Sequence, residues 1–530
     1  MKNIKVKNIV IVGTGTAGWL SALFLSREPK FRDNPNYNVT VIESPNIPTI
    51  GVGESTQPLV TSFMDSCDLT PNDWMPQSSA TYKLGVMFEG WGKHKFMVDS
   101  EDAKFHFIEG ALNTQDIAKS LGMSSKDYMN WHPSFRLSIN NISPRIGKER
   151  FNYSPGNFNE PDNAAQWDNV LLQKHLKDIC ITRGVKLITD NVVDVGLDEQ
   201  DYVTHVLTEN HGNINGDFYI DATGFHAVLA SKVNNPWLSV ENFLPNNNAV
   251  VVRKKYKNPQ QECHPYTNAK TMNAGWRWSI PTHHDMSYGY VYSDKYIDKD
   301  DAEKELRESI NEWKEPALHV PFNAGLRQQI CNKNVLSVGF TAGFVEPLEA
   351  TSLAFTCVVI GDFDKALAQP SSKGITGVWN DQLEHFVNTR FHHVFREIAG
   401  FIYMHYHGST RRDTEYWKAV GKIGVPEYLQ ELYRLVQQQP LTNRDLTRLM
   451  AQGIPTFEGY SAPTSMFAGG HWYQLLSSYG WYDDWVPAGI SDVAIQYGKM
   501  VMDFQTKLAD EVIKSFPNHY DYLTEWYESC

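Results

Sequence analysis

Cysteine is scarce in this chain, and the few cysteines that occur are scattered. The 530 residues include six cysteines, and no two of them form a C-x-x-C pair. A disulfide framework needs paired cysteines, and the common zinc sites need closely spaced ones. We therefore expect free thiols, a reducing cytoplasm and no metal site.

Excess positive charge and long apolar runs are also lacking. The 61 acidic and 48 basic residues give a formal net charge of −13, and no basic cluster offsets it. This balance argues against a nucleic-acid partner. No apolar stretch approaches the roughly 18 residues that cross a membrane, and no signal-peptide pattern opens the sequence. The sequence predicts a protein that binds neither nucleic acid nor membrane.

Aromatic side chains are plentiful, at 12% of the chain, and one stretch concentrates them as GWRWSIP. Residues two apart on a strand share a face, so Trp276 and Trp278 would stand side by side as an aromatic wall. Pro281 has no N–H to donate and would end the strand. On indole chemistry alone, a plain piece of core is the simpler interpretation.

A glycine-rich turn follows the first apolar strand, predicted at 8–12. The turn has the sequence GTGTAG and consists of Gly13, Thr14, Gly15, Thr16, Ala17 and Gly18. This is G-x-G-x-x-G between a strand and a helix, where glycines admit a pyrophosphate that the helix N-terminus stabilises. Glu43 ends a second predicted strand, where it would accept a hydrogen bond from a ribose hydroxyl. The pattern predicts dinucleotide binding.

Two further segments suit the same domain. Residues 51–58 read GVGESTQP, a loop in which Thr56 is predicted to cap the next helix. Residues 217–221 are predicted to form a hairpin with 202–207 and run into the sequence DATG, which many flavoproteins place beside FAD.

Two candidate functional sites lie outside these loops. Residues 81–88 alternate, so Lys83 shares one strand face with Gly85 and Met87; the pattern alone favours a solvated lysine at a sheet edge. An apolar helix from about Ala350 would place the backbone amides of Thr351 and Ser352 at its N-terminus. Free N–H groups and the helix dipole favour a small anion there.

The order of these elements predicts an α/β fold with a composite organisation. A Rossmann-type FAD-binding domain would span 1–370, with substrate-side segments inserted at about 80–165. Residues 90–165 are expected to be rich in loops. A mostly helical region, 371–530, would complete the substrate site.

Together these motifs resemble the flavin-dependent halogenases, in particular the tryptophan halogenase family. W-x-W-x-I-P lies at 276–281, G-V-G-E-x-T at 51–56, and a variant of F-[VL]-E-P-L-E-S-T-G begins at 344. The resemblance implies a fold like that of the flavin monooxygenases and catalysis by Lys83 and Glu349. It assigns FAD to Gly13, Gly15, Thr16, Ala17, Gly18, Glu43, Gly51, Gly53, Glu54, Asp221, Gly224 and Gly339.

The resemblance also implies a reaction. FADH2 from a separate flavin reductase, O2 and a halide held at Thr351 and Ser352 would give hypohalous acid. This electrophile would cross to a small electron-rich aromatic, indole-like or phenol-like. Lys83 would hydrogen-bond the hypohalous acid or become a haloamine, and Glu349 would polarise the halogen donor and take the ring proton.

The aromatic wall would then separate flavin from substrate and suppress direct oxygen transfer to the ring. It is the partition formed by Trp276, Trp278, Ile280 and Pro281. An aromatic monooxygenase that hydroxylates its substrate is the nearest alternative. A flavin-binding protein without turnover is a second alternative, and homo-oligomerisation is left open.

Two departures from the family pattern affect the halide site. Ala350 replaces the serine beside the glutamate, and Ser352 replaces a glycine. Glycine permits backbone conformations and close approaches that serine does not. We therefore expect bromide, or iodide, to be preferred over chloride.

The substrate pocket is the least defined part of the sequence, because the C-terminal third does not align clearly with the family. The aromatic and imidazole side chains that are candidates to contact the substrate are Phe105, His106, Phe107, Phe457, Tyr460 and Trp472.

Overall fold

The computed structural model describes most of the chain. The described residues are 3–27, 37–99, 114–146, 149–150, 164–368, 370–371, 374–375, 377–450, 466–487 and 489–530. No helix within these ranges is long and apolar enough to cross a membrane. All six cysteines are free thiols.

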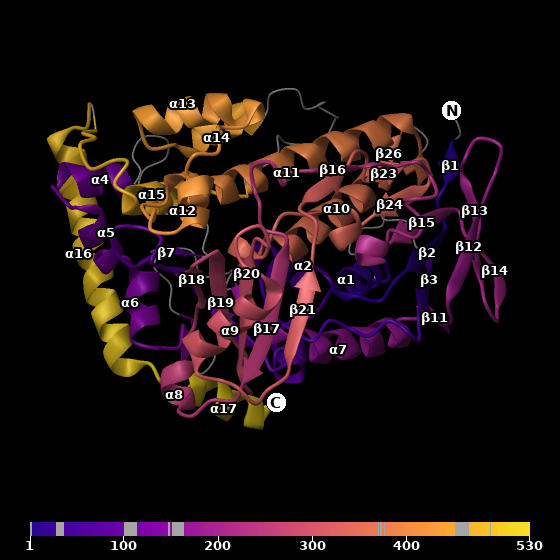
Figure 1. The fold of residues 1–530 in the computed structure, drawn as a ribbon, viewed down its shortest axis with the longest axis horizontal. Helices are drawn as coiled ribbons and strands as arrows, with labels where there is room; N and C mark the ends of the chain where they lie inside the picture. Colours follow the sequence, from indigo (N-terminus) through magenta and orange to yellow (C-terminus); the bar gives the residue numbers. More distant parts are fainter. Residues whose placement is uncertain are drawn as a thin grey trace.

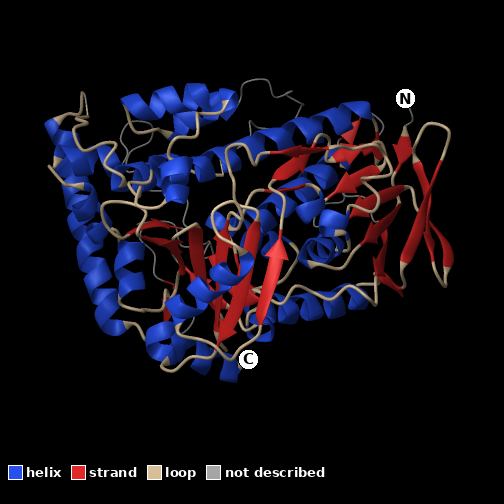
Figure 2. Ribbon diagram, in the orientation of Figure 1, coloured by secondary structure: helices blue, strands red, loops and turns tan. Residues whose placement is uncertain are grey.

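A six-stranded sheet forms the Rossmann-type part of the fold (Figures 1 and 2). Its order is β11 (Lys186–Thr189), β3 (Asn38–Glu43), β2 (Asn8–Val12), β15 (Phe218–Asp221), β24 (Val335–Ser337) and β23 (Cys331–Asn332). The first five strands run parallel, and β23 is antiparallel. Strand β2 has four of its five residues buried, as expected where helices cover both faces. The predicted α/β class is confirmed.

Strand β15 corrects the predicted hairpin between 202–207 and 217–221. It pairs with β2 and β24 and lies inside the parallel sheet, where all four of its residues are buried. Strand β13 (Val203–Thr208) pairs instead with β12 (Val192–Leu197) and β14 (Gly212–Asn215). The turn closes earlier than expected, at Gly212, whose φ of +68° suits glycine.

A seven-stranded sheet carries the aromatic wall. Its order is β21 (Ala317–Pro321), β17 (Asn248–Lys254), β20 (Met286–Tyr292), β19 (Gly275–Pro281), β18 (Thr267–Met272), β6 (Gly85–Glu89) and β7 (Phe96–Asp99). Strand β19 is central and ends at its proline, as predicted. The single strand predicted over 81–88 is wrong, because β5 (Thr81–Lys83) belongs to another sheet with β10 (Ala164–Asp168) and β4 (Gly53–Ser55).

The remaining strands form small sheets. One contains β16 (Trp237–Ser239), β22 (Gly325–Arg327) and β25 (Gly343–Phe344). Two-stranded sheets join β1 (Ile4–Lys5) to β28 (Val378–Trp379), β8 (Arg145–Ile146) to β9 (Glu149–Arg150), and β26 (Pro370–Ser371) to β27 (Gly374–Ile375).

Helices cover the sheets and dominate the second half of the chain (Figures 1 and 2). The early α-helices are α1 (Thr16–Leu25), α2 (Pro58–Ser66), α3 (Pro71–Trp74), α4 (Thr114–Ser120), α5 (Ser125–Trp131), α6 (Pro133–Ile139), α7 (Asn169–Thr182), α8 (Pro259–Glu262), α9 (Lys299–Ile310) and α10 (Thr351–Leu367). The later ones are α11 (Asp381–Gly408), α12 (Glu415–Val420), α13 (Gln430–Gln438), α14 (Asn443–Met450), α15 (Gly469–Ser478), α16 (Asp492–Ser515) and α17 (His519–Ser529). The 3₁₀ turns are η1 (Pro76–Ser78), η2 (Gly224–His226), η3 (Gly339–Thr341), η4 (Leu348–Ala350) and η5 (Glu427–Leu429).

Helices α4, α5 and α6 correct the expectation that residues 90–165 are mostly loop. They lie beside α16 at one end of the molecule, and the parallel sheet lies at the other end (Figure 1). The indole N–H of Trp131 donates to the Met502 carbonyl oxygen at 3.2 Å. Polar residues at α5, such as those of the Ser124–Asp127 capping box, interrupt the helical spacing of apolar residues, so the sequence did not predict this helix.

Candidate active site

The predicted dinucleotide turn has the geometry that its glycines imply. Gly13 has a φ of +102°, and a β-carbon there would lie 2.4 Å from the Ala222 carbonyl oxygen. A β-carbon at Gly18 would lie 2.2 Å from the Gly13 carbonyl oxygen. Only glycine therefore lets these backbones meet. At Gly15, the N-cap of α1, no described atom would contact a β-carbon and no side chain caps the helix. Open space thus faces an uncapped helix N-terminus, which fits a phosphate.

Other residues assigned to FAD converge on the same turn. A β-carbon at Gly339, whose φ is +59°, would lie 2.7 Å from the β-carbon of Ala17. The Thr341 hydroxyl donates to the Gly224 carbonyl oxygen at 2.9 Å. Helix α1 and the loops after β15 and β24 therefore meet at the carboxyl ends of the parallel strands.

The acidic residues that were predicted to bind FAD mostly form hydrogen bonds or ion pairs within the protein. Asp221 accepts hydrogen bonds from four donors in the segment 223–230, so it shapes the loop that carries Gly224. Glu43 accepts from Lys177 Nζ at 2.6 Å. Glu54 lies 3.3 Å from the Thr16 hydroxyl, and burial raises its pKa to about 7. Gly51 and Gly53 precede this glutamate in the chain, and the N–H of Gly53 donates to the Ser287 hydroxyl at 3.2 Å.

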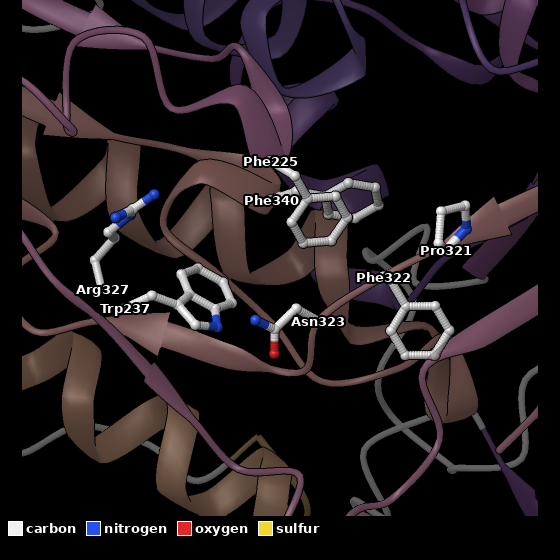
Figure 3. Close-up of a pocket in the computed structure, with 7 residues that line it drawn as sticks. All are labelled: Phe225, Trp237, Pro321, Phe322, Asn323, Arg327 and Phe340. Carbon is white, nitrogen blue, oxygen red and sulfur yellow. The ribbon is translucent and has the colours of Figure 1, made fainter. Parts of the chain in front are cut away.

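A cavity of about 390 Å³ lies next to the loops that carry Gly224 and Gly339 (Figure 3). Its lining residues are Phe225, Trp237, Pro321, Phe322, Asn323, Arg327 and Phe340. The rings of Phe225 and Phe340 are stacked, with centroids 5.2 Å apart. Sequence reasoning missed this cavity, although Phe225 and Phe340 directly follow Gly224 and Gly339.

Lys83 is buried, so the sequence interpretation of a solvated edge lysine is wrong. Its residue is 2% exposed, because β5 is covered on both faces. Its ammonium group donates to the Thr56 carbonyl oxygen at 2.7 Å. Burial lowers the pKa of Lys83 to about 8, and the negative charge of Glu349 opposes that shift.

Thr56 does not cap a helix, which corrects another prediction. The N-cap of α2 is Gln57, without a side-chain hydrogen bond. The Thr56 hydroxyl donates instead to the Ala165 carbonyl oxygen at 2.8 Å, across β10. The side chain of Thr56 thus fixes the loop whose carbonyl group meets Lys83.

Glu349 occupies a strained turn immediately before α10. It has a φ of +66°, and Ala350 has a φ of +56°, which is unfavourable for residues with a β-carbon. The Glu349 side chain is buried, and its Oε1 lies 2.9 Å from His405 Nε2. His405 lies on α11 and was not assigned a role from the sequence.

The helix predicted to hold an anion at its N-terminus is present as α10. Helix α10 begins at Thr351, and the described residues supply no side-chain cap, so its first N–H groups can meet a small anion. Ser352 lies within the right-handed helix. We expected the loss of glycine at 352 to exclude a backbone conformation that only glycine adopts easily. That expectation is wrong, because the left-handed residues of this segment are Glu349 and Ala350.

A second buried carboxyl group, Glu346, ties the aromatic wall to this turn. Its Oε1 accepts from the Trp276 indole N–H at 3.1 Å and from the Tyr406 hydroxyl at 2.6 Å. Its Oε2 accepts from Asn246 Nδ2 at 2.9 Å. Burial raises the pKa of Glu346, and these donors oppose that shift. Sequence reasoning quoted Glu346 within a motif but assigned it no role.

The wall reaches both functional loops. The Trp276 and Trp278 rings have centroids 6.2 Å apart, and both side chains are buried. At the other end of β19, a β-carbon on Gly53 would lie 3.3 Å from Ile280 Cγ2. The Pro281 carbonyl oxygen accepts from the Thr81 hydroxyl at 2.8 Å, two residues before Lys83.

Most of the substrate candidates lie outside the described residues: Phe105, His106, Phe107, Phe457 and Tyr460. Trp472 is described and fully buried on α15. Its ring packs edge-on against Phe401, with centroids 4.8 Å apart, and Phe401 in turn contacts His405. Within the described ranges, no group of three or more His, Cys, Asp or Glu side chains is placed to hold a metal ion.

Comparison with known proteins identifies the family. The family model described as tryptophan halogenase matches residues 8–487. This chain belongs to the tryptophan halogenase family. It is a flavin-dependent halogenase, and hence an oxidoreductase.

Several halogenases are similar over most of their length. Tryptophan 6-halogenase SttH of Streptomyces toxytricini is 32% identical over 452 residues, which cover 80% of this chain and 82% of SttH. 7-Chloro-L-tryptophan 6-halogenase KtzR of Kutzneria sp. (strain 744) is 29% identical over 549 residues, 97% and 98% of the two chains. The SttH crystal structure superposes with a TM-score of 0.83 and covers 98% of this chain and 99% of its own. The predicted fold and family resemblance are thereby confirmed.

Proposed function

We propose that this enzyme uses FADH2 and O2 to halogenate a small electron-rich aromatic, indole-like or phenol-like. The observation that carries the proposal is the burial of Lys83 close enough to Glu349 for the carboxylate to affect the lysine's pKa. SttH and KtzR are named for halogenation of tryptophan and chlorotryptophan, so an indole is the first substrate to test.

The residues around the GTGTAG turn fit the cofactor. Gly13, Gly15 and Gly18 would admit the pyrophosphate of FAD to the uncapped N-terminus of α1. The cavity beside Gly224 and Gly339 is lined by rings that suit a flat ligand. When bound and reduced by a separate flavin reductase, FAD would supply hypohalous acid from O2 and halide.

Lys83 would receive the electrophilic halogen. Its pKa of about 8 leaves part of the population neutral near pH 8, and only the neutral amine has a lone pair for a haloamine. The protonated amine can instead hydrogen-bond hypohalous acid. Both roles need a site from which bulk water is excluded, and Lys83 is almost fully buried.

Glu349 would act as the general base. Attack of the ring on the halogen leaves a cationic intermediate, whose C–H proton must be removed to restore aromaticity. A buried carboxylate stabilises that cation and accepts the proton. Its position next to α10 places it beside the proposed halide amides of Thr351 and Ser352.

The aromatic wall of Trp276, Trp278, Ile280 and Pro281 would act as the partition. Its contacts with Glu346 and Gly53 support a place between the glutamate turn and the glycine-rich loop. Helices α4–α6 and α15–α16, which pack together, would close the substrate side. This arrangement supports the proposed organisation into 1–370, with its insertion, and 371–530.

A product assay tests the function. The enzyme is incubated with FAD, a flavin reductase, NADH and panels of indoles and phenols, and products are identified by mass spectrometry. We expect monohalogenated products; hydroxylated products alone would establish the monooxygenase alternative.

The halide preference is tested in the same assay with equal concentrations of bromide, iodide and chloride. We propose that bromide or iodide is preferred, because larger anions are less tightly hydrated and easier to oxidise, and Ser352 restricts close approach at the amides. Equal or better incorporation of chloride would refute this preference.

A further inference from the structure

Two hydrogen bonds fix the number of protons held by Glu349 and His405. His405 Nδ1 lies 2.8 Å from the Phe401 carbonyl oxygen, which can only accept, so Nδ1 carries a proton. His405 Nε2 lies 2.9 Å from Glu349 Oε1. A neutral imidazole protonated at Nδ1 has a bare Nε2, and two acceptors would then face each other. One further proton must therefore lie between Nε2 and Oε1.

The surroundings decide where that proton resides. His405 is fully buried among the rings of Phe88, Trp91 and Phe401, with centroids 4.9, 6.1 and 5.0 Å away. An imidazole is a stronger base than a carboxylate in water. Glu346, a second buried carboxyl group, also lies near enough to interact electrostatically with His405. The higher basicity of the imidazole and its electrostatic interaction with Glu346 both favour the proton on the imidazole.

We infer that His405 is a positioning residue that holds Glu349 as a carboxylate through a shared proton on its Oε1. This inference rests on the proposed function. Glu349 Oε2 makes no hydrogen bond to any residue in the described part of the chain, so it is the oxygen left for the ring proton. When the ring C–H bond breaks, its electrons stay in the ring, its proton goes to Oε2, and the His405 proton stays in place.

Lys83, Glu346 and Tyr479 are titratable groups near the pair in the described part of the chain. Lys83 approaches from β5, Glu346 lies three residues before Glu349, and Tyr479 follows α15 and donates to the His405 carbonyl oxygen at 3.2 Å. Burial raises the pKa of Tyr479 well above its usual range, so this phenol stays neutral. A protonated His405 partly offsets the charge of Glu349, so the pair favours the protonated form of Lys83 less than a lone carboxylate would.

The proton count is measured on the enzyme without substrate by NMR of isotopically labelled histidine side chains. His405→Phe assigns the signal. We expect both ring nitrogens of His405 to be protonated at neutral pH. In Glu349→Gln the amide can donate to Nε2, so we expect the ring to become neutral with its proton on Nδ1. A neutral His405 in the unchanged enzyme would overturn the inference.

The functional consequence is measured as a pH profile of halogenation. His405→Phe keeps an aromatic ring in the cage but removes the donor. We expect kcat to fall about tenfold or more with little change in KM, and the acid side of the profile to move up by about one pH unit. His405→Gln, whose amide can still donate to Oε1, should recover part of the rate.

His407→Phe is the matched control on the same helix. His407 faces Tyr403 and Tyr433, not Glu349, so its variant should keep the original pH profile. An unchanged profile in His405→Phe would refute the positioning role. If the unchanged enzyme gives no halogenated product, the proposed function fails, and the NMR result still tests the proton count.

Discussion

At the scale of single residues, the site depends on placing charged groups where water is absent. A lysine in water keeps its proton until pH is well above neutral, but burial lowers the pKa of Lys83 to about 8. The unfolded chain has a lysine pKa near 10.4, so between these values it binds more protons than the folded chain. Stability should therefore rise with pH in that interval.

The first prediction concerns Lys83→Met. Between about pH 7.5 and pH 9.5, the free energy of unfolding of the unchanged enzyme should gain about 2 kcal/mol relative to this variant. Urea denaturation of both proteins at the two pH values measures the difference. A constant difference would show that Lys83 is not desolvated.

The second prediction concerns the strain at Ala350, whose φ is +56°. Ala350→Gly should raise the free energy of unfolding by about 1 kcal/mol, because glycine adopts this conformation without steric penalty. Ala419→Gly, within the right-handed helix α12, is the control and should lower stability by about 1 kcal/mol. The same sign for both variants in denaturant titrations would contradict this explanation.

Residue patterns predicted part of this site and missed the rest for physical reasons. Gly13 and Gly18 signal close backbone approach by their identity alone. The identity of Lys83 does not signal its burial, because that burial depends on α17 and β10, which are distant in sequence. His405 joins Glu349 only through the packing of α11, and no local pattern encodes that pairing.

At the scale of elements, one helix fixes both glutamates of the turn. Consecutive residues on α11, His405 and Tyr406, contact Glu349 and Glu346 respectively. The same turn holds the Trp276 indole through Glu346. A shift of α11 would therefore move the proposed base and the proposed partition together.

The third prediction tests this connection with Tyr406→Phe. Loss of a 2.6 Å hydrogen bond to a buried carboxyl group should lower the free energy of unfolding by about 2 kcal/mol. Tyr403→Phe, on the same helix, loses a bond to the Ile423 carbonyl oxygen and one with His407, neither of which involves a buried carboxyl group, and should lose about 1 kcal/mol. Chemical denaturation provides the measurement; a smaller loss for Tyr406→Phe would count against the Glu346 network.

The observed limits of strands and helices match the predicted limits best where a sequence pattern is compatible with a single type of secondary structure. The apolar run at 8–12 and the helix beginning at Thr351 were both predicted close to their observed limits. The segment 81–88 alternates like one strand, but its two halves join different sheets. Alternation reports which side a residue faces and contains no information on which strand it pairs with.

At the scale of the whole molecule, the end of the chain covers the strand that carries Lys83. The Trp526 ring on α17 stacks on Tyr82, with centroids 6.0 Å apart and planes 6° apart. The Tyr527 hydroxyl donates to the Ala80 carbonyl oxygen at 2.5 Å. Residues more than 440 positions apart therefore complete the dry environment of the lysine.

The fourth prediction is that Trp526→Ala loosens this cover. It should lower the free energy of unfolding by about 2 kcal/mol and reduce the pH-dependent stability gain attributed to Lys83. Trp313→Ala, at a tryptophan that is 57% exposed, should change stability by less than about 0.5 kcal/mol. Equal effects of the two variants would show that α17 does not exclude water from Lys83.

Lys83 and Glu349 are proposed to direct halogenation away from the flavin, and the products formed by Lys83→Ala and Glu349→Ala test this proposal. Each variant is supplied with FAD, a flavin reductase, NADH, bromide and an indole that the unchanged enzyme halogenates. We expect both variants to oxidise reduced flavin with O2 but to lose the halogenated product. Retained halogenation in either variant would contradict it.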